Sequence, residues 1–587
     1  MKRVLVTTAL QKTWPSSNEP ILFLGEWCLL YSEKEKWEKL NFKTAPYHWD
    51  DRKKIFKDYN FINKLYEELL SDLAKKLNST HKVNHSIRYW RIIIGPWLGF
   101  FIQTVFDRWS MIEKIIETNN ISYVNVIKCQ DKDFIPNDLE HFSEIYVDDP
   151  WNEYIYGKIL EFYNFKKIKY ITDPKIKLYS ILKIRSFYIK KFKKNFNLLI
   201  NSINRLVSRD DDYFLISTYL PIKQSFLLQI KLGQIPKFWK SIHINSFNSN
   251  FDFRNWSLCN KKLNNNPFAD FIRKIIPMNI PVAYLEGFGE IQNLSNRLPW
   301  PRKPKAIFTS NAFWHDDVFN FWCANLIESG VPLVTGQHGG NYGMALWSFV
   351  EDHQIEISDR FLTWGWRSDK NENIKPLVNL KNLGQKIKSN SKGHLLLVEM
   401  MLPRYSYHMS SLPVSSSQFE KYLTDQYTFL KNLPPNIQKK ILVRTTPFDF
   451  GYDVNQRWID SFPFVKLDPA KKSFVSSMKK SRLFIGTYNA TTFLEALSLN
   501  FPTIVFWNPE HWELNIEATK SFKILKDVGI FHDTPEDAAK KLIAIWDDIE
   551  TWWHSEEIQS ARNKFCNSYS CMPDKSLEEL KYAILDL

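Results

Sequence analysis

The chain has 587 residues, 44% hydrophobic and 24% charged, a composition typical of globular proteins with large cores. Its 15% aromatic residues exclude wholesale disorder, and 18 glycines without a period of 20–50 residues exclude collagen-like and solenoid folds. No stretch of about 18 uncharged apolar residues occurs, so we expect no membrane-spanning helix. Six scattered cysteines argue against a disulfide scaffold or zinc ribbon. We therefore expect a cytoplasmic protein of two or three domains.

The positive charge is concentrated in one segment. The chain carries a net charge of +14, and Lys158–Arg209 alone holds 14 Lys or Arg against two acids, a balance of +12. Aromatic and aliphatic residues interleave with these bases, which predicts a basic helical insertion. Such a surface attracts anionic lipid, at about 1 kcal/mol per basic residue near the membrane. A solvated helix is the alternative, and no recognised motif supports a nucleic-acid partner. We expect peripheral contact at the inner face of the cytoplasmic membrane.

In chain order, the first part of the sequence predicts alternating helices and strands. Strand 3–8 comes first, and apolar residues at three- and four-residue spacing then predict a helix over 51–77. The further expected elements are helix 96–118, strands 123–127, 213–217 and 282–285, and a strand–helix–strand unit over 306–309, 316–329 and 331–335. Strand, helix and strand at this spacing imply parallel pairing.

A linker over 366–392, rich in Asn, Lys and Ser, separates a second alternating block. Its expected elements are strands 394–401, 440–445, 482–486 and 503–506 and helices 492–499 and 533–549. The sequence therefore predicts an α/β protein with two Rossmann-like domains facing a cleft. The first domain spans 1–375 with the basic helical insertion at about 158–209, and the second spans 392–587. In such sheets, ligands lie beyond the carboxyl ends of the strands.

The clearest candidate site follows the strand that ends at Gly486. A loop of hydroxyl and amide side chains leads into a helix, whose start offers unpaired N–H groups that favour a phosphate. The candidate donors to phosphate oxygens are Thr487, Asn489, Thr491 and Thr492. Glu495, one turn later, suits the hydroxyls of a ribose. The alternative is that Thr492 and Glu495 only form a capping box. Arg444, which ends another strand, would neutralise a phosphate at the same edge.

A second candidate site is the glycine-rich loop 335–343. Four glycines in eight residues let the backbone approach a ligand closely. Gln337, His338, Gly339 and Gly340 are the candidate donor-binding residues, and His338 titrates near neutral pH. The alternative is a tight interdomain turn with His338 in the core. The loop is neither a Walker loop nor a dinucleotide fingerprint.

A third candidate site lies in the first domain, where arginines and tryptophans surround a Gly-Pro turn. Arg88 and Arg91 can clamp a carboxylate or phosphate, and Trp90 and Trp97 can stack on a sugar, so we expect an acceptor or an anionic sugar here. The alternative is an aromatic core with surface arginines.

Three residues are candidates for acid–base catalysis: Glu26, in the loop after the first strand, His85 and His338. His315-Asp316-Asp317 could bind a metal or act in acid–base chemistry, but Asp316 and Asp317 also suit the start of the following helix. No cluster has convincing ligand spacing, so we expect no metal and no cofactor.

At these motifs the sequence resembles a family of transferases from bacterial O-antigen and surface-polysaccharide clusters, first grouped from spirochaete lipopolysaccharide loci. The matching pieces are Thr7-Thr8, residues 24–28, residues 89–91 with 95–97, residues 336–340 and residues 486–492. The resemblance implies a GT-B-type glycosyltransferase, with the acceptor on the N-terminal domain, the nucleotide sugar on the C-terminal domain and no required metal.

Together these observations predict a metal-independent glycosyltransferase. It would move a sugar from a nucleotide-sugar donor to a lipid-linked or lipopolysaccharide O-antigen acceptor. A polyol-phosphate transferase of similar architecture and a CMP-linked acidic sugar as donor are alternatives. A non-catalytic carbohydrate-binding scaffold of a polysaccharide assembly is the alternative from a different class.

Overall fold

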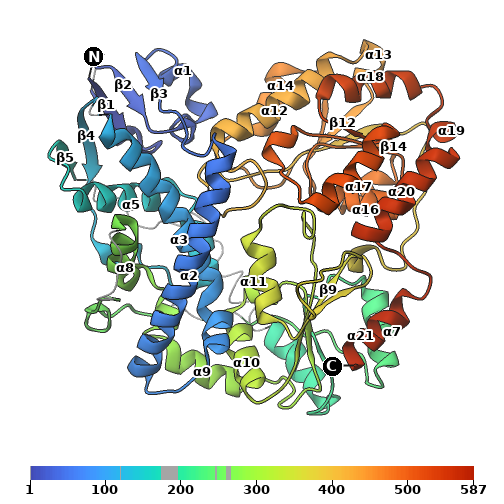
Figure 1. The fold of residues 1–587 in the computed structure, drawn as a ribbon, viewed down its shortest axis with the longest axis horizontal. Helices are drawn as coiled ribbons and strands as arrows, with labels where there is room; N and C mark the ends of the chain where they lie inside the picture. Colours follow the sequence, from blue (N-terminus) through green and yellow to red (C-terminus); the bar gives the residue numbers. More distant parts are fainter. Residues whose placement is uncertain are drawn as a thin grey trace.

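The computed structural model describes residues 2–16, 18–118, 120–172, 196–242, 244, 247–258, 266–406 and 408–586. Three separate sheets, all with parallel pairing, form its framework. The first lies at the upper left of Figure 1, the third at the upper right, and the second below the third, around β9. The predicted α/β class with parallel sheets is confirmed. Residues 1–375, expected as one domain, hold two of the three sheets.

The first sheet has the strand order β3-β2-β1-β4-β5. Its strands are β1 (Arg3–Val6), β2 (Ile21–Phe23), β3 (Phe42–Thr44), β4 (Ile121–Ile127) and β5 (Ile168–Ile171). Its helices are α1 (Lys34–Trp37), α2 (Arg52–His81), α3 (Ile87–Glu117), α4 (Leu139–Ile145) and α5 (Asp149–Phe162). One continuous core joins this sheet to α2 and α3 and to the helices around residues 267–328.

Helices α2 and α3 begin where side chains cap them. Asp51 accepts hydrogen bonds from the N–H groups of Lys53 and Lys54, and Ser86 accepts from Tyr89. The predicted start of the second helix at Pro96 is wrong, because α3 runs through this proline. An internal proline costs about 3 kcal/mol, which the near-complete burial of α3 offsets.

The second sheet has the order β10-β9-β8-β7-β6. Its strands are β6 (Phe214–Leu215), β7 (Ile307–Thr309), β8 (Leu333–Gly336), β9 (Arg360–Thr363) and β10 (Ile374–Pro376). Its neighbours are α7 (Ile222–Lys231), α8 (Pro267–Asn279), α9 (Phe288–Asn296), α10 (Asp317–Glu328) and α11 (Phe349–Ile357). The predicted parallel unit is present as β7–α10–β8. The run expected as strand 282–285 instead forms the short 3-10 helix η6 (Val282–Tyr284), directly after Pro281.

The third sheet has the order β13-β12-β11-β14-β15-β16. Its strands are β11 (His394–Val398), β12 (Ile441–Arg444), β13 (Lys466–Asp468), β14 (Ser481–Gly486), β15 (Thr503–Phe506) and β16 (Phe531–His532). The core of one face includes α12 (Ser416–Lys431), α13 (Pro435–Gln438), α14 (Val454–Ser461) and α18 (Pro535–Ile545). The core of the other includes α15 (Phe474–Met478), α16 (Thr491–Ser498), α17 (Ile516–Asp527), α19 (Ile549–His554) and α20 (Glu556–Tyr569).

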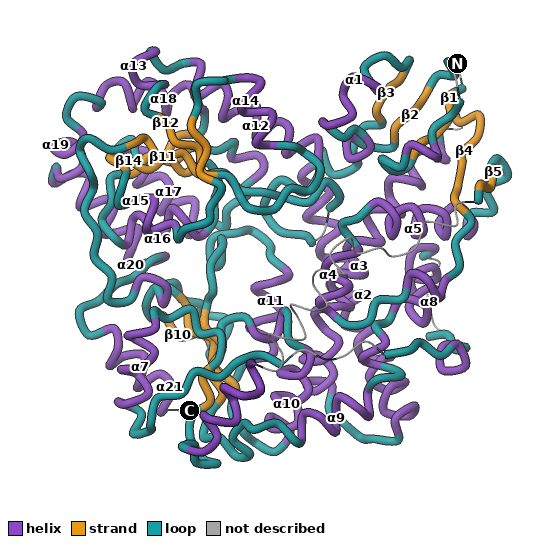
Figure 2. Tube along the Cα trace, turned by 180° about the vertical axis from the view of Figure 1, so that it is seen from behind, coloured by secondary structure: helices purple, strands orange, loops and turns teal. Residues whose placement is uncertain are grey.

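The last helix, α21 (Ser576–Leu585), leaves the third sheet and returns to the second. Leu580 and Ile584 are buried in the core of the second sheet, and Arg360 at the start of β9 donates to the carbonyl oxygen of Ala583 at 2.8 Å. Figure 2 shows α21 beside α7 and the C-terminus near β10. The chain therefore passes from the second sheet to the third between β10 and β11, and it returns to the second sheet in α21.

The predicted basic insertion has mixed structure where it is described. Its first residues end α5, residues 168–171 form β5, and residues 196–206 are helical. Residues 173–195, with Lys190–Lys194, lie outside the described residues. None of the described helices is long and apolar enough to span a bilayer.

Candidate functional site

A cavity of about 730 Å³ lies between the second and third sheets. Strand β6 leads to it on one side, and β11, β12 and β14 end at it on the other. The polar side chains that line it are Tyr219, Lys381, Gln385, Glu399, Arg444, Thr445, Thr446, Ser473, Ser476, Lys479, Tyr488, Thr491, Thr492 and Glu495. The expected position beyond the carboxyl ends of parallel strands is thus the position of the cavity.

The loop between β14 and α16 supplies one wall of this cavity. Helix α16 begins after Ala490, which has no capping side chain, so the capping-box alternative is wrong. Thr492 Oγ1 instead donates to the hydroxyl of Tyr488 at 3.0 Å. Glu495 Oε1 accepts from Lys381 Nζ at 2.5 Å. Three predicted residues, Thr491, Thr492 and Glu495, therefore line the cavity with side-chain oxygens that do not cap the helix.

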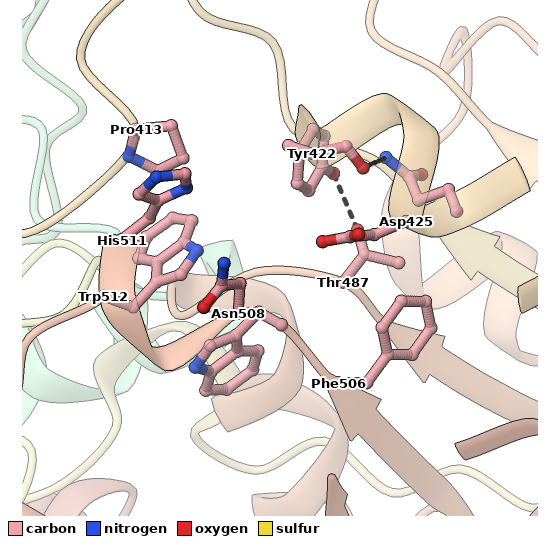
Figure 3. A pocket seen from close by; sticks show the side chains of 10 residues that line it. Pro413, Tyr422, Asp425, Thr487, Phe506, Asn508, His511 and Trp512 are labelled. Atoms are coloured by element: carbon pink, nitrogen blue, oxygen red, sulfur yellow. Dashed lines mark hydrogen bonds between the residues drawn. The ribbon is translucent and has the colours of Figure 1, made fainter. Parts of the chain in front are cut away.

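Two other predicted residues of this loop do not line the large cavity. Thr487 Oγ1 donates to the carbonyl oxygen of Val398 at 2.8 Å and is hydrogen-bonded to the hydroxyl of Tyr422 at 2.7 Å. Figure 3 shows Thr487 and Tyr422 together in a small neighbouring pocket, with His511 and Trp512 at its other end. Asn489 is buried. Thr487 therefore connects β14 to β11 and α12, and its oxygen is already engaged.

Arg444 ends β12 and forms a basic wall with Lys479. Its guanidinium donates to Asp468 Oδ2 at 2.7 Å, to Ser477 Oγ at 3.1 Å and to the carbonyl oxygen of Lys472 at 2.7 Å. These bonds fix the position of Arg444, while hydroxyl groups of the cavity surround it. A wall of cations and hydroxyl groups suits the oxygens of a phosphate.

The glycine-rich loop meets the start of α16. Gly340 N–H donates to Thr491 Oγ1 at 2.8 Å, and a Cβ on Gly339 would lie 2.3 Å from that same oxygen. Gly340 has φ +70°, a conformation that favours glycine. Gln337 is fully buried and accepts from Trp364 N–H and Trp366 Nε1, so it supports the loop. Gly339 and Gly340 therefore allow the loop after β8 of the second sheet to contact the start of α16, which follows β14 of the third sheet.

His338 lies beside the cavity without lining it. Its ring is 6.0 Å from that of Tyr219, and burial lowers the pKa of His338 to about 4. The imidazole is therefore neutral near pH 7. Nδ1 has no hydrogen-bond partner among the described residues. The same burial disfavours protonation of this imidazole and so weakens it as a base.

Tyr219, which the sequence analysis did not identify, stands on a strained backbone. Its φ is +62°, and Ser217 has φ +49°. Such conformations cost about 1–3 kcal/mol each and persist where neighbours hold them. Ser310 donates from its N–H to the carbonyl oxygen of Ser217 at 3.0 Å and from Oγ to that of Thr218 at 3.1 Å, and Asn311 donates to the Tyr219 hydroxyl. The position after a predicted strand could have drawn attention to Tyr219.

Lys381 and Glu399 were also missed. Lys381 belongs to the linker, which has no sequence pattern that marks it. Glu399 follows β11 and is 3% exposed; Trp458 Nε1 donates to its Oε1 at 2.7 Å, and its Oε2 has no partner in the described part of the chain. Burial raises the pKa of Glu399 to about 8, so its carboxyl group is protonated at neutral pH.

The residues predicted for an acceptor site in the first domain are core tryptophans and ion-paired arginines. Trp90 and Trp97 are fully buried in the core and offer no face to a sugar. Arg88 forms two hydrogen bonds with Asp359, and Arg91 forms two with Glu67. This arrangement corresponds to the alternative given above, an aromatic core with surface arginines.

The three candidate acid–base residues lie in different places. His85 Nδ1 is 2.6 Å from Glu328 Oε2 at the start of α3, away from the cavity lining. Glu26 lies in the loop after β2, where burial raises its pKa and Thr44 contacts it. Of these three residues, His338 adjoins the large cavity, whereas Glu26 and His85 do not line it.

The His315 motif begins a helix. Asp316 Oδ1 accepts from the N–H of Phe319 at 2.9 Å, so Asp316 is the N-cap of α10, as predicted. Within the described ranges, no group of three or more His, Cys, Asp or Glu side chains has a metal-binding arrangement.

Comparison with solved structures gives similarities at low identity. A spinosyn rhamnosyltransferase, SpnG, in complex with spinosyn aglycone is 12% identical and covers 48% of this chain and 73% of its own, with a TM-score of 0.28. WaaG, a glycosyltransferase involved in lipopolysaccharide biosynthesis, is 10% identical over 51% of this chain and 95% of its own, with a TM-score of 0.27. A UDP-forming trehalose-phosphate synthase from Burkholderia xenovorans is 10% identical over 54% and 80%, with a TM-score of 0.28.

Among curated proteins, no sequence matches this chain significantly. A family model, by contrast, matches almost its whole length, over residues 3–584, and is described as LIC12162 family transferase. The predicted family is thus confirmed, and the chain belongs to the LIC12162 family of transferases.

Proposed function

We propose that the protein is a metal-independent glycosyltransferase whose nucleotide-sugar donor binds in the cavity between the second and third sheets. The observation that carries the proposal is the cavity wall itself. Arg444 and Lys479 line this cavity together with Thr491 and Thr492 at the start of α16. Positive groups and a helix N-terminus that converge at the ends of parallel strands suit a diphosphate or monophosphate.

The same wall can supply the chemistry of a departing nucleotide. Negative charge develops on the phosphate as the glycosidic bond breaks, and fixed cations and N–H groups stabilise it. Arg444 is held by Asp468, Ser477 and the Lys472 carbonyl, so little reorganisation is needed. These groups would supply the positive charge that a divalent ion could otherwise provide at the departing phosphate.

Glu495 and His338 complete the proposed site. Glu495 would bind ribose hydroxyl groups with the oxygen that Lys381 leaves available, or in exchange for the Lys381 pair. His338, whose ring lies beside that of the cavity residue Tyr219, would accept the proton of the attacking hydroxyl once a bound donor and acceptor change its surroundings. The acceptor we propose is a lipid-linked or lipopolysaccharide O-antigen glycan.

A panel of nucleotides tests the donor assignment. Calorimetry with CMP, UDP, GDP and dTDP, all in EDTA, should show binding of at least one, and the corresponding nucleotide sugars should then be hydrolysed or transferred. Arg444→Gln should weaken nucleotide binding about tenfold or more, since hydrogen bonds to charged groups contribute about 1.5–3 kcal/mol. Arg457→Gln is the matched control, because Arg457 pairs with Glu420 and does not line the cavity.

The outcomes also separate the alternatives. Binding of a CDP-linked polyol, with release of CMP, would indicate a polyol-phosphate transferase. Glycan binding without affinity for any nucleotide would indicate a carbohydrate-binding scaffold and would overturn the proposal.

A further inference from the structure

The second sheet contributes an aromatic side chain to the cavity that it shares with the third sheet. Tyr219, Leu220 and Pro221, which follow β6, line this cavity, and Tyr219 is the aromatic residue among them. Tyr219 is 38% exposed, so its ring is accessible to a ligand. The groups assigned above to the phosphate, by contrast, belong to the third sheet. The two sheets therefore give the cavity surfaces of different chemistry.

The chain holds this tyrosine in a conformation that a glycine would adopt more easily. Tyr219 has φ +62° and Ser217 has φ +49°, and both residues carry a Cβ atom, which disfavours this region. A strained position of this kind persists only where the surrounding structure holds it, and such positions cluster at ligand-binding sites. The strain at Tyr219 therefore points to a role for its side chain.

Two residues that follow β7 fix the position of the ring. Asn311 Nδ2 donates to the hydroxyl of Tyr219 at 3.0 Å, and Ser310 Oγ donates to the carbonyl oxygen of Thr218 at 3.1 Å. Because the backbone and the hydroxyl are both bound, the ring loses little further conformational freedom when a ligand binds. Burial raises the pKa of Tyr219, so the hydroxyl keeps its proton and can donate a hydrogen bond to an oxygen of the ligand.

The ring of Tyr219 neighbours residues that we assign to the donor and to the acceptor. Its centroid is 6.0 Å from that of the His338 ring and 5.7 Å from Lys381 Nζ. Lys381 Nζ in turn donates to Glu495 Oε1, and Glu495 is the proposed ribose ligand. His338 is the proposed base for the attacking hydroxyl. A group that packs on Tyr219 is therefore close to the point where the donor and the acceptor meet.

The chemistry of this surface suits a pyranose ring. The face of an aromatic ring is its negative region, and the C–H groups on the apolar face of a pyranose carry the complementary partial charge. The hydroxyl groups at the edge of such a sugar can pair with the polar groups around the ring, which are Lys381 Nζ and the Tyr219 hydroxyl. The same aromatic face would repel a phosphate. The surface therefore favours a sugar over the charged part of the donor.

We propose that Tyr219 is the platform on which a pyranose ring of the reacting glycan packs, beside His338. This role rests on the proposed function, because it takes the wall around Arg444 and α16 as the nucleotide site. The pyranose has one of two sources, the transferred sugar of the donor or the accepting sugar of the glycan. Both present the same apolar face to the ring, and separate measurements of donor and acceptor affinity distinguish them.

Three variants of the full-length protein test the platform. Tyr219→Leu removes the aromatic face but keeps a Cβ atom, so the backbone strain is unchanged. Tyr219→Phe keeps the ring and loses only the bond from Asn311. Tyr219→Gly removes the ring and relieves the strain, so its melting temperature should equal or exceed that of the Leu variant. The matched control is Tyr582→Leu, because Tyr582 is 53% exposed, has Lys581 Nζ 5.3 Å from its ring centroid and does not line the cavity.

Calorimetry measures the nucleotide and the sugar separately. The ligands are CMP, UDP, GDP and dTDP, then CMP-N-acetylneuraminate, UDP-glucose, GDP-mannose and dTDP-rhamnose, and finally oligosaccharides released from lipopolysaccharide by mild acid. The Leu and Gly variants should bind the free nucleotide like the parent. They should bind the nucleotide sugar or the oligosaccharide about fivefold or more weakly, because the aromatic face and the apolar area that it buries are lost. The Phe variant should retain most of this affinity, and the Tyr582 control should retain all of it.

Weaker binding of the nucleotide sugar assigns the transferred sugar to the platform, and weaker binding of the oligosaccharide assigns the accepting sugar. A Leu variant that binds both ligands like the parent would overturn the platform and leave the nucleotide site in place. Loss of free-nucleotide affinity in the Leu variant would assign the ring to the nucleotide and would overturn the platform as well. If the parent binds the oligosaccharide but no nucleotide, the proposed function fails, and the platform is upheld or overturned by the oligosaccharide affinity of the Leu variant. A parent that binds none of these ligands would overturn both.

Discussion

The N–H of Gly340 donates to Thr491 Oγ1 at 2.8 Å and so joins a loop of the second sheet to the helix start of the third. The contact is close enough that a side chain on Gly339 would collide with the same hydroxyl. Two motifs that lie 151 residues apart therefore meet at one oxygen atom at the edge of the proposed donor site.

Thr491→Val should separate the loops. Valine keeps the shape but removes the acceptor of the Gly340 N–H, and leaving such a group unpaired costs about 1–3 kcal/mol. We expect a lower melting temperature and weaker nucleotide binding by calorimetry. Thr491→Ser retains the oxygen and should behave like the parent. A Val variant that melts and binds like the parent would show that this bond does not hold the site together.

Glu495→Gln tests the proposed ribose ligand. Since α16 begins after Ala490 without a side-chain cap, the substitution should leave the helix intact. The loss of one charge-assisted bond, worth about 1.5–3 kcal/mol, should weaken nucleotide binding about tenfold or more. Glu420→Gln, which alters a carboxylate paired with Arg457 outside the cavity, is the control. If the Glu495 variant binds the nucleotide as tightly as the parent, Glu495 is not a ribose ligand, and its role is the ion pair with Lys381.

Activity should survive EDTA. Arg444, Lys479 and the start of α16 provide positive charge at the proposed phosphate site, so no divalent ion is needed there. Turnover of the best nucleotide sugar is measured before and after chelation. Complete loss that Mg²⁺ or Mn²⁺ restores would refute the expectation.

Glu399 should make stability depend on pH. The folded protein keeps its carboxyl protonated up to about pH 8, whereas an ordinary Glu loses its proton near 4.5. Because the folded state then holds the extra proton, the free energy of unfolding falls as pH rises from about 4.5 to 8. Glu399→Gln removes the titrating group and should flatten the dependence of the melting temperature over this range. Parallel curves for parent and variant would contradict the prediction.

The basic run should contribute an electrostatic part to vesicle binding. Replacement of Lys190, Lys191, Lys193 and Lys194, which lie outside the described residues, by Gln should reduce sedimentation with anionic vesicles at low salt. Added salt should release the parent, because charges are screened beyond roughly 8 Å at physiological ionic strength. Equal sedimentation of parent and variant at low salt would exclude a role for these lysines.

Local sequence signals determined much of the secondary structure. The apolar runs that become β4, β8, β11, β14 and β15, the periodicity of α2 and the Asp316 cap of α10 all act over a few residues, and each was found. The edge of the sheet where the cavity lies was also predictable, since parallel strands end together. Thr491, Thr492, Glu495 and Arg444 were placed at the cavity for this reason.

Tertiary structure alone decided the rest. Residues 1–375 form two sheets because strand pairing depends on contacts between distant segments, which no local pattern records. The tryptophans of α3 look like a sugar platform in sequence and are core in the fold, because burial depends on what packs against a helix. Lys381 reaches Glu495 across 114 residues, and Ser310 Oγ donates to the carbonyl oxygen of Thr218, directly before Tyr219, across 92 residues. Tertiary contacts also decide the orientation of the helix over residues 196–206. Its orientation is fixed by hydrogen bonds from Asn197, Asn201 and Asn204 to the backbone of residues 238–241.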